Sequence, residues 1–155
     1  MVPVRAGHYQ NAYVTRNIEK TVSAFRAIAD VRMITEHDGA IAVRTPAGVL
    51  QMHNKLALIW VGDLQYEFIE PVGGAVEFYR EALPDDDAPR FHHVCMRVPD
   101  WELFRRSVDE TRFPVVIEGE AGPLKFIYLD ARATLGHYLE YTYMPDEIWA
   151  ASGGR

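Results

Sequence analysis

The chain has 155 residues, of which 48% are hydrophobic and 25% charged, and its formal net charge is −6. This length and composition fit one compact soluble unit, or two small modules that share one core. The acidic balance, without a basic patch, argues against nucleic acid and anionic membranes as partners, and no apolar run approaches the roughly 20 residues of a membrane-spanning helix. Cys95 is the single cysteine, and the first ten residues lack an apolar signal segment, so we expect a cytoplasmic protein.

The first half of the chain reads as a strand, a helix and then several strands. Asn17 is a good N-cap for a segment that carries apolar side chains at helical spacing. Turn residues separate the extended segments that follow the helix. The strand is expected at 11–15, the helix at 16–29, and the later strands at 31–38 or 40–45, at 55–62 and at 64–71.

The second half repeats this order. Asp100 is the N-cap of a helix over 101–112, whose apolar residues share one face. Strands are expected at 93–98, 113–119, 124–130 and 136–144. Residues 73–89 are expected to form a short helix followed by a polar stretch, and we interpret them as a linker. We therefore divide the chain into a first module, 1–72, a linker, 73–89, and a second module, 90–155.

Adding one constant to the residue numbers of the first half aligns its first strand and helix with those of the second half. A shift of 83 residues takes Asn17 to Asp100, one N-cap onto the other, and takes Gln10 to His93. Because side chains alternate along a strand, the residues at every second position share a face. The open face of the sheet should therefore carry Gln10, Ala12 and Val14 in one half and His93, Cys95 and Arg97 in the other, while Val94, Met96 and Val98 pack under the helix.

Each half also places an acid inside its last strand. Glu67 and Glu140 lie among aromatic and aliphatic residues, where an ionised carboxylate is costly unless something compensates its charge. The shift between these two residues is 73, so the first half holds about ten extra residues in its middle loops.

Paired strand–helix–three-strand modules with these residues resemble the vicinal oxygen chelate superfamily, which includes glyoxalase I, methylmalonyl-CoA epimerase, extradiol dioxygenases and bleomycin-resistance proteins. The resemblance covers nearly the whole chain and implies an α+β fold, in which two βαβββ modules form a curved, largely antiparallel sheet cleft. In that family the first and last strands of each module supply metal ligands, which fall here on Gln10, Glu67, His93 and Glu140. This order is similar to that of glyoxalase I of the eukaryotic type, whereas many bacterial relatives have His at the position of Gln10.

The chemistry of these side chains agrees with that transfer. One imidazole with three oxygen donors suits a borderline or hard divalent ion such as zinc, nickel, cobalt or manganese, and the two carboxylates offset its charge. His8 is the alternative to Gln10 if the strand slips by two residues. His92 should point to the helix side by strand alternation and is interpreted as structural or as a neighbour of the ligands.

The resemblance implies a metal-dependent isomerase or lyase that moves a proton next to a carbonyl, through an enolate or enediolate that the metal stabilises. Glu140 or Glu67 would be the base, and the residues do not decide between them. Three residues near the expected ligands would contact a small substrate with vicinal oxygens: Arg97 as a partner for an anion, Tyr138 and Thr142 as its lining.

Two other functions stay open. An extradiol dioxygenase would hold ferrous iron with two histidines and one carboxylate, which fits only if His8 is a ligand. The other function is a metal-free binding protein of the bleomycin-resistance type, and the presence of both Glu67 and Glu140 argues against it. We expect a homodimer, in which the modules either close on each other within one chain or pair across two chains.

Overall fold

The computed structural model describes residues 6–155 and confirms the α+β fold of two βαβββ modules. The first module and the linker helix contain β1 (Gly7–Val14), α1 (Ile18–Arg26), β2 (Met33–Thr45), β3 (Gly48–Val61), β4 (Leu64–Gly74) and α2 (Glu77–Arg80). The second contains β5 (Arg90–Arg97), α3 (Trp101–Ser107), β6 (Val115–Ala121), β7 (Leu124–Leu129), α4 (Arg132–Leu135), β8 (Tyr138–Tyr143) and α5 (Asp146–Ala151).

The two modules keep the sequence register that the shift of 83 predicts. The Asn17 side chain caps α1 by accepting from the Lys20 amide, and the Asp100 side chain caps α3 by accepting from the Leu103 amide. In each module the first strand also runs parallel to the last. In these pairs Ala12 lies opposite Glu67 and Gln10 opposite Gln65, while Cys95 lies opposite Glu140 and His93 opposite Tyr138.

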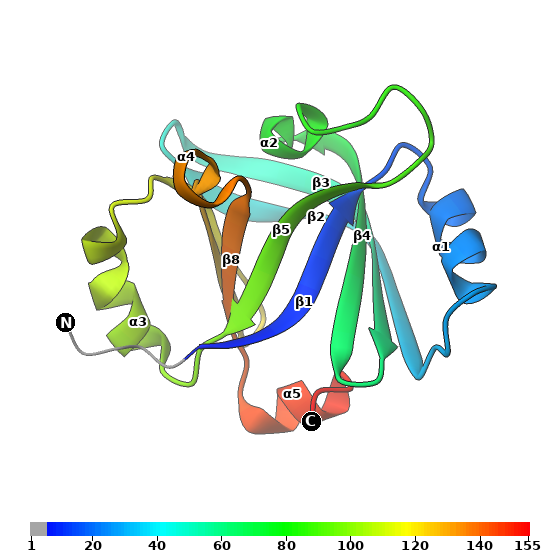
Figure 1. The fold of residues 1–155 in the computed structure, drawn as a ribbon. Coiled ribbons are helices and arrows are strands. Elements are labelled where there is room, and N and C mark those ends of the chain that lie inside the picture. The colour runs from blue at the N-terminus through cyan, green and yellow to red at the C-terminus, as the bar shows by residue number, and fades with distance from the viewer. Residues whose placement is uncertain (1–5) are drawn as a thin grey trace.

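The sheet closes into a barrel in the order β1-β4-β3-β2-β6-β7-β8-β5 (Figure 1). Strands β1 and β5 pair antiparallel and join the modules at one seam. At the other seam β2 meets β6 at only two positions, Val43 with Gly119 and Arg44 with Glu118. This contact exists because segments 31–38 and 40–45, which the sequence offers as alternatives, form one long β2 that reaches across to β6.

Helices α1 and α3 cover the outside of the barrel on opposite sides (Figure 1). Ile18 and Val22 of α1 pack with residues of β3 and β4, including Ile59 and Phe68. Three apolar residues of the segment that begins with α3, Trp101, Phe104 and Val108, pack with the outer faces of β5, β7 and β8. Val94, Met96 and Val98 belong to this second cluster, as strand alternation predicts.

The two ends of the barrel are covered by α2 and α5 (Figure 1). Phe78 and Tyr79 of α2 belong to the core cluster that fills one end of the interior. At the other end, Trp149 of α5 packs edge-on against Tyr9 and Trp60, with ring centroids 4.8 and 5.6 Å apart. The interior of the barrel therefore lies between these two plugs.

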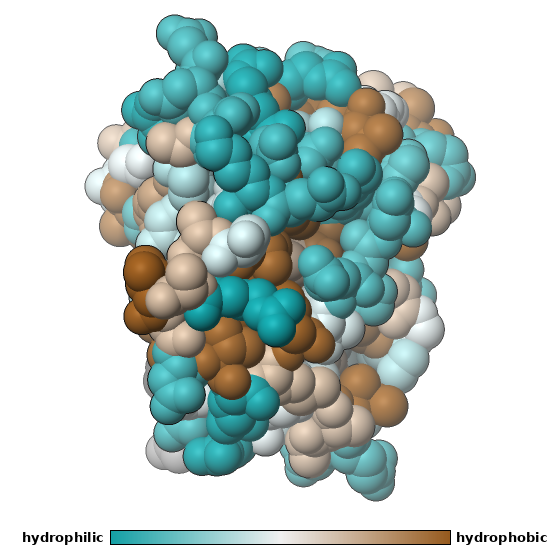
Figure 2. Space-filling view, turned by 90° about the vertical axis from the view of Figure 1, so that its right-hand side faces the viewer, coloured by the Kyte–Doolittle hydropathy of each residue, from teal (hydrophilic) through white to brown (hydrophobic). Residues whose placement is uncertain are grey.

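Figure 2 shows the face that carries α1, where hydrophilic side chains cover the upper part and hydrophobic ones are interspersed below. The linker crosses this face and is held to α1 by an ion pair of 3.0 Å between Lys20 and Asp87. Both side chains are largely exposed, so the pair adds little stability. In the described part of the chain, no helix has the length and apolar character that crossing a membrane requires.

Candidate metal centre

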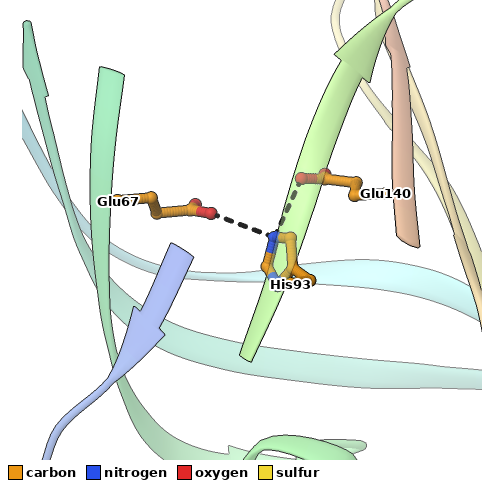
Figure 3. A group of neighbouring side chains, drawn as sticks. All are labelled: Glu67, His93 and Glu140. Atoms are coloured by element: carbon orange, nitrogen blue, oxygen red, sulfur yellow. Dashed lines mark hydrogen bonds and ion pairs between the residues drawn. The ribbon is translucent and has the colours of Figure 1, made fainter. Parts of the chain in front are cut away.

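Two carboxylates and one imidazole from both modules converge inside the barrel (Figure 3). His93 Nε2 lies 3.2 Å from Oε2 of Glu140 and 3.5 Å from Oε2 of Glu67. One ligand atom of each residue falls within a group whose members are all within 4.8 Å of one another. All three side chains are buried, and they come from β4, β5 and β8 of a single chain.

Gln10 completes this side of the interior with an unpaired oxygen. Its Nε2 donates to Oε1 of Gln65 over 2.7 Å, but its own Oε1 is buried without a hydrogen-bond partner among the described residues. Oε2 of Glu67 is likewise without a hydrogen-bond partner apart from its longer contact with His93. Buried polar atoms are normally paired, so two unpaired oxygens beside an imidazole and a second carboxylate fit the ligand set of a divalent cation.

The electrostatics of the group also favour a positive charge at its centre. Burial raises the pKa of Glu67, and the nearby charge of Glu140 raises it further. Burial by itself lowers the pKa of His93, but the close contacts of its ring with the carboxylates of Glu140 and Glu67 outweigh burial and raise that pKa to about 9. A proton on His93 therefore offsets part of the carboxylate charge, and a bound cation would offset it more fully.

His92 lies inside the barrel, which corrects the expectation that it points to the helix side. Ala12 pairs with His93 and Tyr13 with Phe91, so His92 is an extra residue on β5 at a β-bulge. Its Nδ1 lies 2.9 Å from Nδ1 of His93. The bulge turns both neighbouring rings to the same side, where strict alternation would separate them.

A second bulge decides the place of His8. His8 pairs with Met96 and Gln10 with Cys95, which leaves Tyr9 as the extra residue of β1. Tyr9 and Gln10 both face the interior, while His8 is exposed and lies 2.8 Å from Oδ1 of Asn11. The alternative in which His8 replaces Gln10 at the site is therefore wrong for this structure.

The converging side chains border a cavity of about 390 Å³. Gln10, Glu67 and Glu140 line it, while His93 lies behind the two acids. Thr142 also lines the cavity, as the sequence predicts for its position, and its hydroxyl is 3.0 Å from that of Tyr9. The cavity reaches the surface between exposed residues 37–40 of β2 and Ala121 at the end of β6, next to the short seam.

Arg97 lies outside the set of residues that line the cavity. One guanidinium nitrogen donates to the carbonyl of Met144 over 2.9 Å and to Asp146 over 2.7 Å. The guanidinium also lies over the ring of Trp149, 4.7 Å from its centroid. Arg97 lies on the face of β5 that strand alternation predicts. The segment around α5 covers this face, however, so Arg97 contacts that segment and holds it in place.

Tyr138 also lies away from the cavity. Its ring stacks on His92 with centroids 4.8 Å apart, and the guanidinium of Arg132 lies over its ring at 4.7 Å. It belongs to the aromatic core under α2. Neither Tyr138 nor Arg97 is therefore placed to touch a molecule in the cavity, in contrast to the expectation from their strand positions.

Sequence reasoning missed several polar residues that line the cavity, and four of them show which signals were available. Gln65 could have been found, because it lies two positions before Glu67 and so on the same face. Tyr79 and Tyr128, whose hydroxyls are 2.9 Å apart, come from α2 and β7 and meet only in the folded chain. Asn54 of β3 is the fourth, and its strand gave no signal beyond alternation.

Comparison with known proteins identifies the family. Residues 9–128 match the family model of the Glyoxalase/Bleomycin resistance protein/Dioxygenase superfamily, so the chain belongs to this superfamily. No curated protein matches the chain in sequence.

Solved structures with the same fold have little sequence identity. Methylmalonyl-CoA epimerase from Mycobacterium tuberculosis is 12% identical, with a TM-score of 0.65 over 93% of this chain and 91% of that one. A hypothetical protein from Bacillus halodurans C-125 is 14% identical, with a TM-score of 0.66 over 90% and 95%. Methylmalonyl-CoA epimerase from Streptomyces coelicolor, solved with 2-nitronate-propionyl-CoA, is 13% identical, with a TM-score of 0.61 over 91% and 95%.

Proposed function

We propose that this member of the superfamily is a metal-dependent isomerase or lyase that moves a proton on a carbon next to a carbonyl. The observation that carries the proposal is the buried convergence of Glu67, His93 and Glu140 beside the unpaired Oε1 of Gln10. These four residues would hold one divalent ion, and zinc, nickel, cobalt or manganese suits one imidazole with three oxygen donors better than softer ions do. When bound, the ion would act as a Lewis acid towards two adjacent oxygens of the substrate.

Glu67 and Glu140 are the two groups that could carry the proton. Both carboxylates line the cavity, so each can approach a substrate carbon, and neither is more exposed than 7%. A buried carboxylate that exchanges a proton with substrate is shielded from bulk water, which keeps the proton on the reacting pair. The two acids come from β4 and β8, which β1 and β5 separate in the barrel, so they approach the site from two different strands.

Other residues would orient the substrate and exclude water. Thr142 and Tyr9, joined by their hydroxyls, lie on the α5 side of the acids. Tyr128 lies opposite Glu140 in the β7–β8 ladder, and its ring packs edge-on against His93. Burial raises the pKa of Tyr128 well above its usual value, so its hydroxyl stays a hydrogen-bond donor.

A ring-cleaving dioxygenase is less compatible with these contacts. That chemistry uses two histidines and one carboxylate around ferrous iron, and the group here contains one histidine and two carboxylates. The second imidazole nearby, His92, bonds to His93 and to the carbonyl of Phe78. We place the proposed activity in the cytoplasm and expect a homodimer, as is common for small enzymes.

Metal analysis and isotope exchange test this proposal. The protein is purified without added metal, stripped with a chelator and titrated with zinc, nickel, cobalt and manganese. We expect about one equivalent to bind, and expect the loaded protein to catalyse deuterium uptake next to the carbonyl of α-hydroxyketones in D2O. Glu67→Gln and Glu140→Gln form a matched pair, and the one that abolishes exchange while keeping metal identifies the base.

The outcomes separate the three functions. Bound iron with oxygen consumption would support the dioxygenase. Ligand binding by a protein that takes up none of the four metals would support the metal-free binding protein. Either result would overturn the proposed proton transfer.

A further inference from the structure

The cavity extends from the acids along the inner face of β3, and one polar side chain interrupts its apolar wall. Met52, Leu56 and Leu58 line this wall at alternate positions, with Asn54 between them. Asn54 is only 6% exposed, and its Oδ1 has no hydrogen-bond partner among the described residues. A buried amide without a partner costs stability, so a bound group that completes its hydrogen bonds would be favoured at this position.

Space for such a group is present in front of Asn54. Gly39 of β2 lies directly opposite Asn54 in the β2–β3 ladder and also lines the cavity. A Cβ added to Gly39 would meet no atom within 4 Å, so the glycine leaves open room there. A Cβ at position 39 would therefore project into this room without touching the protein.

Asn54 lies well away from the acids. Leu58 is paired with Glu67, and Asn54 precedes Leu58 by four residues on the same strand. At a rise of about 3.3 Å per residue, the two strand positions are roughly 13 Å apart. The wall between them is apolar and includes Leu56, Leu124 and Phe126.

Away from the acids, the described residues of the cavity lining offer no cationic partner for an anionic group. Among the described residues that line the cavity none is Lys or Arg, and the one histidine, His37, is exposed at its mouth. Glu67 and Glu140 lie at the inner end, and Asp38, paired with His53 at 2.7 Å, lies at the mouth. An anionic group beside Asn54 would lose its hydration without gaining a cationic side chain as a partner.

We propose that Asn54 is a substrate-binding residue and that the cavity takes a neutral, elongated, largely apolar molecule. One end of this molecule reaches the acids, and an uncharged hydrogen-bonding group at its other end lies against the Asn54 amide. Assigning the inner end as the reacting end rests on the proposed function, whereas binding at Asn54 does not.

Three aryl-1,2-diones test the inference as probes. They carry a carboxamide, a methyl or a carboxylate group in the para position, and calorimetry measures their affinity for metal-free and metal-loaded protein. For the wild type we expect the carboxamide to bind about 10-fold tighter than the methyl compound, which corresponds to one good hydrogen bond, and the carboxylate to bind weakest.

Two variants and one control locate the contact. Asn54→Leu should remove the advantage of the carboxamide, and the methyl compound should then bind at least as tightly. Gly39→Val should weaken all three probes by about 10-fold or more while zinc affinity stays unchanged. Asn11→Leu, outside the cavity, should leave every affinity as in the wild type, and circular dichroism checks that each variant is folded.

The results distinguish this inference from the proposed function. Equal binding of the carboxylate, or a carboxamide advantage that survives Asn54→Leu, overturns the inference even if metal binds and exchange occurs. A carboxamide advantage that depends on Asn54 in protein that binds no metal supports the inference and overturns the proposed function.

Discussion

His93 and His92 contact each other through like atoms, with the two Nδ1 nitrogens 2.9 Å apart. His92 Nε2 lies 2.8 Å from the carbonyl of Phe78, which can only accept, so this nitrogen carries the hydrogen. Burial, followed by the charge of His93, lowers the pKa of His92 to about 3, so the ring is neutral and its Nδ1 accepts from His93. His93 therefore keeps Nε2 facing the two carboxylates, where a metal ligand is needed.

Replacing His92 should weaken metal binding without removing a ligand. His92→Phe keeps an aromatic ring between Phe78 and Tyr138 but offers no acceptor to His93, so zinc affinity should fall by about 10-fold or more. A competition titration with a chromophoric chelator measures this change. His8→Phe, at an exposed position, is the control and should bind zinc as the wild type does; equal affinities for all three proteins would refute the tautomer argument.

The metal-free protein should lose stability as the pH rises from about 6.5 to 9. Burial lowers the pKa of His93, but its close contacts with the carboxylates of Glu140 and Glu67 raise the net value to about 9, above its value in the unfolded chain. A raised pKa in the folded state stabilises below the unfolded pKa, and this contribution disappears as the pH passes through the folded one. Urea unfolding across this range measures the slope.

His93→Gln provides the comparison, because it cannot titrate there and should show a flatter profile. Metal binding near pH 7.5 should also release about one proton from His93 in the wild type, since the ion and the proton compete for Nε2. Calorimetry in two buffers of different ionisation enthalpy measures the release. Binding without proton release would place the metal elsewhere.

Replacing Arg97 should loosen the C-terminal segment and leave metal affinity unchanged. Arg97→Ala removes a donor from the Met144 carbonyl and the stacking on Trp149, and we expect a loss of about 1–2 kcal/mol. Hydrogen exchange over residues 144–154 should accelerate. Arg32→Ala, which removes the donor to the Gly153 carbonyl, should accelerate exchange in the same segment. Lost metal binding or unchanged exchange in Arg97→Ala would restore the idea that Arg97 serves the site.

Alanine substitutions at two glycines distinguish the cost of a packing clash from the cost of backbone strain. Gly153 has φ +98°, and a Cβ there would lie 2.7 Å from Trp60 and 2.9 Å from the sulfur of Met33. Gly122 has φ +60°, and a Cβ there would meet no atom within 4 Å. Gly122→Ala should therefore cost about 1 kcal/mol of unfolding free energy, and Gly153→Ala about 2–4 kcal/mol. Similar losses in urea unfolding would mean that the α5 end is loosely packed.

The sequence was sufficient to predict two modules and to predict that residues from both modules meet at one site. Asn17 and Asp100 reveal the repeat because an N-cap has a local chemical signature. Alternation then brings Gln10 and His93 to equivalent places, with Glu67 and Glu140 on the strands beside them. Their role as ligands stays a prediction, although the structure brings Glu67, His93 and Glu140 together and lines the same cavity with Gln10.

Only the tertiary structure determined the side-chain directions and contacts that strand alternation could not predict. The bulges at Tyr9 and His92 arise where β1 and β5 meet across the seam, so cross-strand hydrogen bonding, and not local preference, turns His8 outward and His92 inward. The stacking of Arg97 on Trp149 likewise depends on where α5 docks. A period of two fixes which face a residue takes within one strand, but bulges and end caps depend on partners far away in the chain.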